Sequence, residues 1–268
     1  MNKAADLRRK LMAKTRKDVQ EKFSGDESHL VKAVGLIQTL DEISNIMFEQ
    51  VREWYALYFP ELERKVKDPE AYLRLVYELT EKENFTQKKV SEFYKNEKVA
   101  AELETLAKNG VGAEASKETI AEIKLLSLNS LNLKEERKFL SNYAENIAKK
   151  IMPNFSVIAG GVLAGKMLAK AGSLKKLSMM PASTIQILGA DKAIFAHIKS
   201  GAKSPKHGLL FQHPIVSSVP KKLKGKAAKL VAAKLTIAVK ADYFSKENIS
   251  EKLKQDLEKK VSALKGTK

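Results

Sequence analysis

The residues best suited to chemistry lie in the segment 189–214, GADKAIFAHIKSGAKSPKHGLLFQHP, and the chemistry they suit is phosphate binding. Between residues 189 and 240 the chain has eleven lysines, no arginine and a single acidic residue, Asp191. Lysine is a compact point charge that suits phosphate oxygens, whereas the planar fork of arginine suits bidentate contacts with base edges. This composition therefore predicts recognition of the backbone and shape of a polyanion.

No residue pattern in the chain predicts catalysis or a metal centre. There is no cysteine, no G-x-S-x-G segment and no carboxylate pair inside the lysine-rich part. Zinc needs three or four ligands at chelating spacing, and no carboxylate joins His207 and His213, which lie close in sequence. We therefore predict a protein that is not an enzyme and has no catalytic residue, metal or cofactor. For these two histidines, hydrogen bonding to phosphate or to a partner rivals a structural role.

The segment 160–166, GGVLAGK, matches part of the phosphate loop of nucleotide hydrolases. The next residue is Met167, where the magnesium site of such a loop needs a Ser or Thr hydroxyl. A helix of small residues that lets backbones pack closely is the preferred interpretation. A nucleotide hydrolase that uses Lys166 remains as an alternative, and loss of ATP turnover in Lys166→Ala would support it.

The charge distribution divides the chain near Pro153. All seven arginines precede this residue, and residues 151–240 hold fifteen lysines and one acidic residue. A compact domain with such a surface repels itself unless a polyanion compensates the charge. We predict an all-α fold of four parts: a basic N-terminal segment at 1–27, a helical coiled-coil domain at 28–150, a compact helical domain at 151–245, and a C-terminal helix or tail at 246–268.

Two long helices are predicted at about 28–58 and 116–150. Their apolar residues recur in heptad-like spacing, and Pro60 ends the first helix. Such seams must be buried, which predicts a long antiparallel coiled-coil arm. The seam residues are Ile37, Leu40, Met47 and Val51 in the first helix and Leu126, Leu133, Leu140 and Ile147 in the second.

Further helices are predicted between the two long ones, over about 68–107. Asp68 followed by Pro69 is a favoured pair of helix-start residues. Thr80 and Glu83 have the spacing of a capping box, which predicts a second helix start there.

The helix predicted after Pro220 has a basic face and an apolar face. Its basic and polar stripe, at helical spacing, consists of Lys222, Lys226, Lys229, Thr236 and Lys240. Lys234 falls on the apolar side, and we predict that its charged end reaches past that side to solvent.

The two ends of the chain are predicted to be helical. Leu7, Leu11, Val19 and Phe23 fall near one face of a basic helix, and residues 245–264 have apolar positions at helical spacing. The N-terminus has no apolar signal region, and no window approaches the ~18 apolar residues of a membrane span. Together with the absence of cysteine, this predicts a cytoplasmic protein with no membrane contact.

Four segments of the chain resemble the Nop-domain family, the RNA-binding scaffolds of box C/D ribonucleoproteins. They are REWYALYFPEL at 52–62, AGSLKKLSMMPASTIQILGADKAIF at 171–195, the lysine-rich segment 189–214, and KGKAAKLVAAKLTIAVKADYF at 224–244. The resemblance covers most of the chain after about residue 28 and is to the archaeal form of the scaffold, so the cytoplasm would be that of an archaeal cell.

The resemblance implies a non-catalytic scaffold that guides 2′-O-methylation of ribosomal or transfer RNA. The compact domain would be a Nop-type RNA-binding domain that recognises kink-turn RNA of a box C/D guide together with its small, ribosomal-type kink-turn-binding protein. The arm would pair two copies of the scaffold through its seam. The methyltransferase fibrillarin would bring S-adenosylmethionine, the only cofactor of the assembly, and perform the chemistry.

Two sets of residues carry the expected contacts. Those expected to bind RNA, from the resemblance and from helical spacing, are Lys192, Lys199, Lys203, Lys206, His207, Gln212, Lys222, Lys226 and Lys229. Those expected to meet the protein partner of the RNA, from the resemblance, are Gln186, Gly189, Ala190, Asp191, Phe195, Pro205 and Gly208. For Phe195, packing inward is the other expectation.

One departure from the family leaves an alternative open. Family members usually carry a larger α/β domain before the coiled coil, where fibrillarin docks, and here about 28 residues precede the arm. Two expectations follow: fibrillarin binds a reduced platform built from this segment and the base of the arm, or the chain is an N-terminally shortened form. No fibrillarin-docking residue is therefore assigned. The alternative is a spliceosome-type relative that shares the Nop domain and has no methyltransferase partner.

Overall fold

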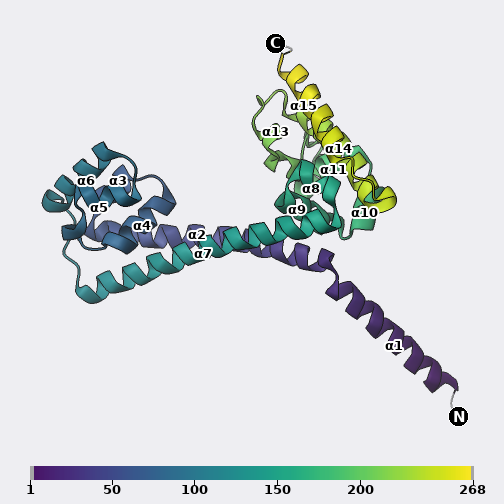
Figure 1. The fold of residues 1–268 in the computed structure, drawn as a ribbon, viewed down its shortest axis with the longest axis horizontal. Helices are drawn as coiled ribbons and strands as arrows, with labels where there is room; N and C mark the ends of the chain where they lie inside the picture. The colour runs from purple at the N-terminus through teal and green to yellow at the C-terminus, as the bar shows by residue number, and fades with distance from the viewer. Residues whose placement is uncertain (1–2, 267–268) are drawn as a thin grey trace. The chain divides into compact units, whose positions relative to one another are not determined.

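The computed structural model describes residues 3–266 and is entirely helical, with no strand among those residues. This confirms the predicted all-α class. The chain forms two compact units, one of Met1–Leu36 with Leu140–Lys268 and the other of Ile37–Phe139. Two long helices, α2 (Asp26–Tyr58) and α7 (Lys117–Ile151), contribute to both units (Figure 1). The predicted domain boundaries at residues 27, 150 and 245 stay predictions.

Helices α2 and α7 run antiparallel in the unit Ile37–Phe139. The Nε of Arg137 donates a hydrogen bond of 2.7 Å to Oδ1 of Asp41, while Ile123 shares a core with Val51 and Tyr55. Residues later in α2 thus meet residues earlier in α7. The two long helices and the predicted antiparallel arm are confirmed, and α2 ends just before Pro60 as expected.

Aromatic rings fill the core of this unit. Phe59 and Phe85 pack edge to face with centroids 5.1 Å apart, and Tyr55 packs against Phe59 and Tyr72 at 6.5 Å. All four are buried. The short helices around them are α3 (Pro60–Lys65), α4 (Pro69–Leu79), η1 (Lys82–Asn84), α5 (Gln87–Phe93) and α6 (Glu97–Asn109). The aromatic core therefore holds the short helices of this unit against the two long ones, α2 and α7.

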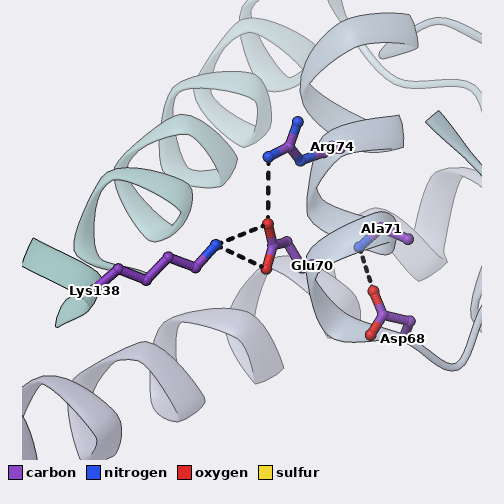
Figure 2. Close-up of polar contacts among 5 residues, drawn as sticks. All are labelled: Asp68, Glu70, Ala71, Arg74 and Lys138. Carbon is purple, nitrogen blue, oxygen red and sulfur yellow. Dashed lines mark hydrogen bonds and ion pairs between the residues drawn. The ribbon is translucent and has the colours of Figure 1, made fainter. Parts of the chain in front are cut away.

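The start of α4 shows one sequence signal confirmed. Asp68 is the N-cap, and its Oδ2 accepts a hydrogen bond of 2.7 Å from the backbone N–H of Ala71 (Figure 2). Glu70, in the first turn of α4, accepts a hydrogen bond of 3.3 Å from Arg74 of the same helix and bonds of 3.3 and 3.4 Å from Lys138 of α7. This charge cluster ties α4 to α7.

The predicted capping box at Thr80 and Glu83 is wrong. Thr80 ends α4 with a positive φ of 48°, and its hydroxyl donates back to the carbonyl oxygen of Tyr77 at 3.0 Å. The next α-helix begins after Thr86, whose side chain accepts a hydrogen bond from Lys89 N at 3.5 Å. The hydroxyl of Thr80 therefore closes one helix and does not open the next.

The other unit packs short helices around α14, and they gather together in Figure 1. Their bounds are α8 (Pro153–Ala159), α9 (Gly161–Ala171), α10 (Leu174–Met179), α11 (Ala182–Ile187), α12 (Asp191–Ser200), η2 (Leu209–Gln212), α13 (Pro214–Ser217), α14 (Lys224–Lys240), η3 (Ala241–Ser245) and α15 (Ser250–Gly266). Helix α14 contacts α8, α10, α11, α13 and α15 and is the centre of this unit.

Helix α9 confirms the small-residue interpretation of 160–166. A Cβ on Gly165 would lie 2.6 Å from a methyl carbon of Val34 and 3.0 Å from one of Leu30, both in α2. A Cβ on Gly161 would lie 2.4 Å from Cα of Glu145 in α7. The segment is a helix that lets backbones approach, and it forms no phosphate-cradling loop.

The C-terminal helix α15 docks on α14 and α8. Its Asp256 forms an ion pair with Lys234, whose side chain is only 12% exposed. The expectation that Lys234 reaches past the apolar face to solvent is therefore wrong, because a carboxylate from α15 meets its ammonium. The docking explains why a charged residue stands among the apolar residues of α14.

A buried carboxylate fixes the end of α14 to the start of α8. Asp242 accepts hydrogen bonds from the backbone N–H groups of Asn154 and Phe155, at 2.9 and 2.8 Å, and one of 2.7 Å from the amide Nδ2 of Asn154. Burial raises the pKa of Asp242, and these bonds partly oppose the rise. The same Asn154 accepts from Ile249 N at 2.7 Å, so the segment leading into α15 is tied to the same point.

The predicted N-terminal helix is present as α1 (Lys3–Ser24), with Leu7, Leu11 and Val19 exposed. The side chain of Phe23 lies outside the described residues. No helix in the part of the chain that the structure covers combines the length and the apolar character needed to span a bilayer.

Candidate nucleic-acid interface

Helix α12 places three of the candidate residues at the surface. It begins two residues after Gly189, which has a φ of +81°, and ends at Gly201, which has a φ of +66°. Both are left-handed conformations that glycine adopts without strain. Lys192 and Lys199 are exposed, and Phe195 is 66% exposed. Phe195 thus points outward, so the expectation that it packs inward is wrong, and its contact with a protein partner stays a prediction.

The loop 201–208 is fastened to the end of α11. The backbone N–H of Gly208 donates to Gln186 O at 3.0 Å, and Leu209 N donates to Leu188 O at 2.8 Å. A Cβ on Gly208 would lie 2.1 Å from Leu188 O, so only glycine fits there. The Nε2 of Gln186 donates to Lys206 O at 2.8 Å. The candidates Gln186 and Gly208 therefore act on the shape of the loop.

The same loop meets the start of α14. Gln186 Nε2 also donates to Gly225 O at 3.4 Å, and a Cβ built on Gly225 would lie 3.3 Å from Cβ of Lys206. The exposed Lys206 therefore lies over the first turn of α14. Lys203 is exposed within the loop, and Pro205 is half-buried.

An aromatic and cationic stack lies beside this contact. The rings of His207 and Phe211 are stacked with centroids 5.0 Å apart and an interplanar angle of 29°. The Nζ of Lys224 lies 4.4 Å from the centroid of Phe211. The Nζ of Lys166 donates to Oε1 of the neighbouring Gln212 at 3.0 Å. Sequence analysis assigned no role to Phe211 or Lys224, although an aromatic residue four positions after His207 in a basic loop was a usable signal.

Helix α14 carries the predicted stripe. Lys226, Lys229 and Lys240 are exposed, and Lys222 is exposed just before the helix begins. The opposite face, which includes Ala227, Ala228, Val231, Leu235 and Ala238, is fully buried. The predicted division of this helix into a basic face and a core face is confirmed.

His213 is structural, so a phosphate-binding role for it is wrong. It is 4% exposed, its Nε2 lies 2.8 Å from Ile158 O, and its Nδ1 accepts from Ile215 N at 3.2 Å. These bonds require a neutral ring with its proton on Nε2, and burial lowers the pKa of His213 accordingly. The half-buried His207 is the histidine that reaches the surface of the loop.

Asp191, the one acidic residue among 151–240, is already paired. Its Oδ2 lies 2.9 Å from Nζ of Lys170, and both side chains are largely exposed. Ala190, its neighbour at the start of α12, is half-buried. The acid therefore offsets a lysine outside the candidate set, which leaves the positive charge of that set uncompensated within this region.

The structure brings part of the candidate set together and spreads the rest. Contacts around the start of α14 gather Gln186, Gly189, Lys206, His207, Gly208 and Gln212. Lys192, Phe195, Lys199 and Lys203 lie on α12 and the loop after it, while Lys226 and Lys229 follow along α14.

The predicted seam residues contribute mainly to packing inside the chain. Ile37, Leu40 and Val51 are buried, and Met47, Leu126, Leu133, Leu140 and Ile147 are half-buried. Met47 and Leu126 also line a shallow groove with the exposed Ile46, Trp54 and Leu57.

No group of three or more histidine, cysteine or carboxylate side chains in the described residues could hold a metal ion. The candidate residues instead form a surface of exposed lysines on a helical domain. The protein is therefore of the class of helical proteins with a basic surface that suits a polyanion.

Comparison with known proteins identifies the family. The family described as "Nop: snoRNA binding domain, fibrillarin" matches residues 36–263. The chain belongs to the Nop family.

Two curated relatives agree with this placement. A NOP5 family protein of Methanocaldococcus jannaschii is 36% identical over 250 residues, which cover 93% of this chain and 60% of that protein. Nucleolar protein 58 of Rattus norvegicus is 35% identical over 231 residues, 85% of this chain and 43% of the relative. The chain therefore spans about half the length of such relatives.

One solved structure of similar fold is a crystal structure of a fibrillarin/Nop5p complex. It matches with a TM-score of 0.54 and 23% identity, and the match covers 97% of this chain and 78% of that one. At this identity the likeness establishes the fold.

Proposed function

We propose that this chain is a non-catalytic, RNA-binding scaffold of a box C/D ribonucleoprotein that guides 2′-O-methylation of ribosomal or transfer RNA. The observation that carries the proposal is the charge of residues 151–240, fifteen lysines and one acid, combined with a fold that exposes both lysines of α12 and three of the five in α14. Membership of a family described by snoRNA binding supports RNA as the polyanion.

The ligand we propose is kink-turn RNA of a box C/D guide, already bent by its ribosomal-type kink-turn-binding protein. The residues that contact phosphates in this proposal are Lys192, Lys199, Lys203, Lys206, Lys222, Lys226 and Lys229. Phe195, which is exposed beside Lys192 and Lys199 on α12, contacts the protein. Phosphate contacts fix register and orientation, so this chain reads shape.

Fibrillarin is the proposed catalytic partner and supplies S-adenosylmethionine and the methyl transfer. A curated relative belongs to the NOP5 family, and a solved structure of similar fold contains Nop5p with fibrillarin. The contribution of this chain is the positioning of substrate RNA, which makes the methyl transfer effectively intramolecular. Co-purification of fibrillarin from source-cell extract checks this part, and its absence would favour the spliceosome-type alternative.

A double charge reversal tests the RNA surface. Lys199→Glu with Lys206→Glu is expected to abolish assembly on kink-turn RNA in a gel shift with the kink-turn-binding protein present. A matched control, called the arm control, reverses Lys98 of α6 and Lys117 of α7, two exposed lysines of the unit Ile37–Phe139, and changes the net charge equally. Circular dichroism checks that all variants keep their helicity. Unchanged RNA retention by the first variant would contradict the proposed site.

We also propose that the chain forms a homodimer through the arm. The groove lined by Ile46, Met47, Trp54, Leu57 and Leu126 supports this, because its exposed apolar residues lie on α2 beside two residues of the predicted seam. Sedimentation of the unaltered chain at micromolar concentration is expected to give the mass of a dimer. The double variant Ile46→Lys with Leu57→Lys is expected to be a monomer that keeps its helicity. A monomeric mass for the unaltered chain would refute the homodimer.

A further inference from the structure

The aromatic and cationic stack at the start of α14 is more exposed than an ordinary packed aromatic residue. Phe211 is 45% exposed although His207 stacks on it and Lys224 lies 4.4 Å from its ring centroid. Within the fold, burying this ring further would have been favourable. The ring is instead kept at the surface of the most basic part of the chain.

The backbone on both sides of Phe211 is firmly anchored. Leu210, the preceding residue, is fully buried, and His213, two residues on, is 4% exposed with both ring nitrogens in hydrogen bonds. The turn that carries the ring is η2, whose start is pinned by Leu209 N donating to Leu188 O at 2.8 Å. The position of the exposed ring is thus set before any ligand binds, which lowers the entropy cost of stacking on it.

The side chains around the stack supply positive charge. Lys206 lies over Gly225 in the first turn of α14, Lys224 is the first residue of that helix, and Lys166 contacts Gln212 beside Phe211. A nucleotide has a flat base and a phosphate a few ångströms away. An aromatic pair with one lysine, Lys224, over a ring and other lysines beside it offers a contact to each of these two parts.

We propose that the pair His207–Phe211 is a stacking platform for one unpaired nucleobase of the bound RNA, with Lys206 and Lys224 meeting the adjoining phosphates. The proposal rests on the proposed function, since it concerns the same RNA. It adds a contact of a different kind, because stacking does not weaken with salt as phosphate contacts do. Because every base has a flat face, the platform accepts any base and requires only that it be unpaired.

The platform predicts which nucleotides matter. A duplex keeps its bases stacked on one another, so only a nucleotide extruded from a loop, bulge or kink can reach the rings. Stacking of a base on an aromatic side chain accounts for about tenfold in affinity by substitution. Removing the base from that one nucleotide should therefore weaken binding about tenfold, and removing other unpaired bases should not.

The test couples a change in the protein to a change in the RNA. The full chain is titrated onto kink-turn RNA carrying the kink-turn-binding protein, with one abasic nucleotide placed in turn at each unpaired position. For the unaltered chain one position is expected to lose about tenfold. Phe211→Leu is expected to lose about tenfold on intact RNA and nothing further at that position, whereas Phe211→Trp keeps the affinity.

Phe244→Leu is the matched control, because Phe244 is also an exposed aromatic residue of this unit, at 59%, and lies outside the candidate surface. It should bind as the unaltered chain does. Far-UV circular dichroism and thermal unfolding check the fold of Phe211→Leu, and His207→Ala gives a second variant that leaves η2 intact.

Three results overturn the platform. If Phe211→Leu and the unaltered chain bind the RNA equally well, the stacking platform is wrong and the proposed function is unaffected. A loss in Phe211→Leu that is the same at every abasic position would assign the ring to the kink-turn-binding protein. Failure of the unaltered chain to bind this RNA at low salt would remove the proposed function and the platform together.

Discussion

The unit Ile37–Phe139 and the region 151–240 differ in the size of the side chains that pack their helices together. The first has a core of large aromatic rings, with Tyr55, Phe59, Tyr72 and Phe85 all buried. The second packs short helices through small residues: Ala164, Ala227, Ala228, Ala232 and Ala238 are fully buried, and Gly165 has side chains of α2 within 3.1 Å of where its Cβ would lie.

The two regions also differ in how far their charged side chains are paired with opposite charges. In the unit Ile37–Phe139, lysines and arginines meet carboxylates of other elements, as in Arg137–Asp41, Lys138–Glu70 and Lys65–Glu102. In residues 151–240 the one acid is paired with Lys170, and Lys234 is paired with Asp256 of α15. Lys192 and Lys199 of α12 and Lys226, Lys229 and Lys240 of α14 are exposed. Several charged residues of the unit Ile37–Phe139 are thus paired within that unit, whereas the region 151–240 presents a group of exposed lysines.

The largest effect on stability is expected from the aromatic core. Phe59→Ala should lower the free energy of unfolding by about 3–5 kcal/mol, because Phe59 is fully buried and packs on Phe85 and Tyr55. Urea unfolding followed by circular dichroism measures this. In the region 151–240, Phe195→Ala should lower the free energy of unfolding by less than about 1 kcal/mol, because Phe195 is exposed. Similar losses in the two variants would contradict the contrast between a buried ring, Phe59, and an exposed one, Phe195.

A buried histidine should make the stability of the lysine-rich region depend on pH. Replacing His213 by Gln is expected to cost about 1–2 kcal/mol near pH 7.5, since Gln does not reproduce both hydrogen bonds. Burial lowers the pKa of His213 below its ordinary value of 6.5. As pH falls through 6.5 the unfolded chain binds a proton that the folded chain refuses, so the stabilisation is present above 6.5 and is lost below it.

Unfolding of the unaltered chain and His213→Gln at several pH values measures this dependence. The difference in unfolding free energy should narrow from pH 7.5 to about pH 5. A difference that widens as the pH falls would mean that His213 is protonated in the folded chain. That would contradict the assignment of its proton to Nε2 alone.

The smallest effect is expected from the charge cluster in Figure 2. Burial would raise the pKa of Glu70, but hydrogen bonds and charges from Lys138 and Arg74 outweigh it and lower that pKa. Lys138→Gln should cost about 0.5 kcal/mol at most near pH 7, because the Lys138 and Glu70 side chains are 61% and 38% exposed and solvent screens them.

The lowered pKa of Glu70 sets the sign of the pH dependence. The stabilisation is present above the ordinary carboxylate pKa and is lost as the pH falls through the lowered value, so the variant and the unaltered chain should converge in acid. Lys117→Gln on the same helix is the control. A loss above about 2 kcal/mol would show that charge pairs contribute far more to the arm than surface pairs do.

Sequence periodicity was enough to predict the elements that present a long, uniform face. The limits of α2 and α7, the two faces of α14 and the small-residue packing of α9 all follow from repeats of three and four or from steric size. Contacts between distant segments could not be predicted this way. The Lys234–Asp256 pair and the burial of His213 depend on where α15 and α8 dock, which no local pattern encodes.

The candidate surface shows the same limit. Helical spacing predicted the exposed face of α14 with Lys226, Lys229 and Lys240, and the resemblance predicted which segments carry the surface. Neither predicted the stack of His207, Phe211 and Lys224, since its members belong to a loop, a turn and a helix that meet through the hydrogen bonds of Gln186. The capping box at Thr80 failed because Thr80 bonds to the helix behind it.

The salt dependence of RNA binding tests the central claim most directly. Affinity for kink-turn RNA with its protein is measured from low to high salt for the unaltered chain, for Lys226→Gln with Lys229→Gln, and for the arm control Lys98→Gln with Lys117→Gln. Each lost phosphate contact reduces the slope of log affinity against log salt by about 0.7–0.9. The account predicts a slope shallower by about 1.4–1.8 for the α14 variant and an unchanged slope for the arm control. Equal slopes for all three would contradict it.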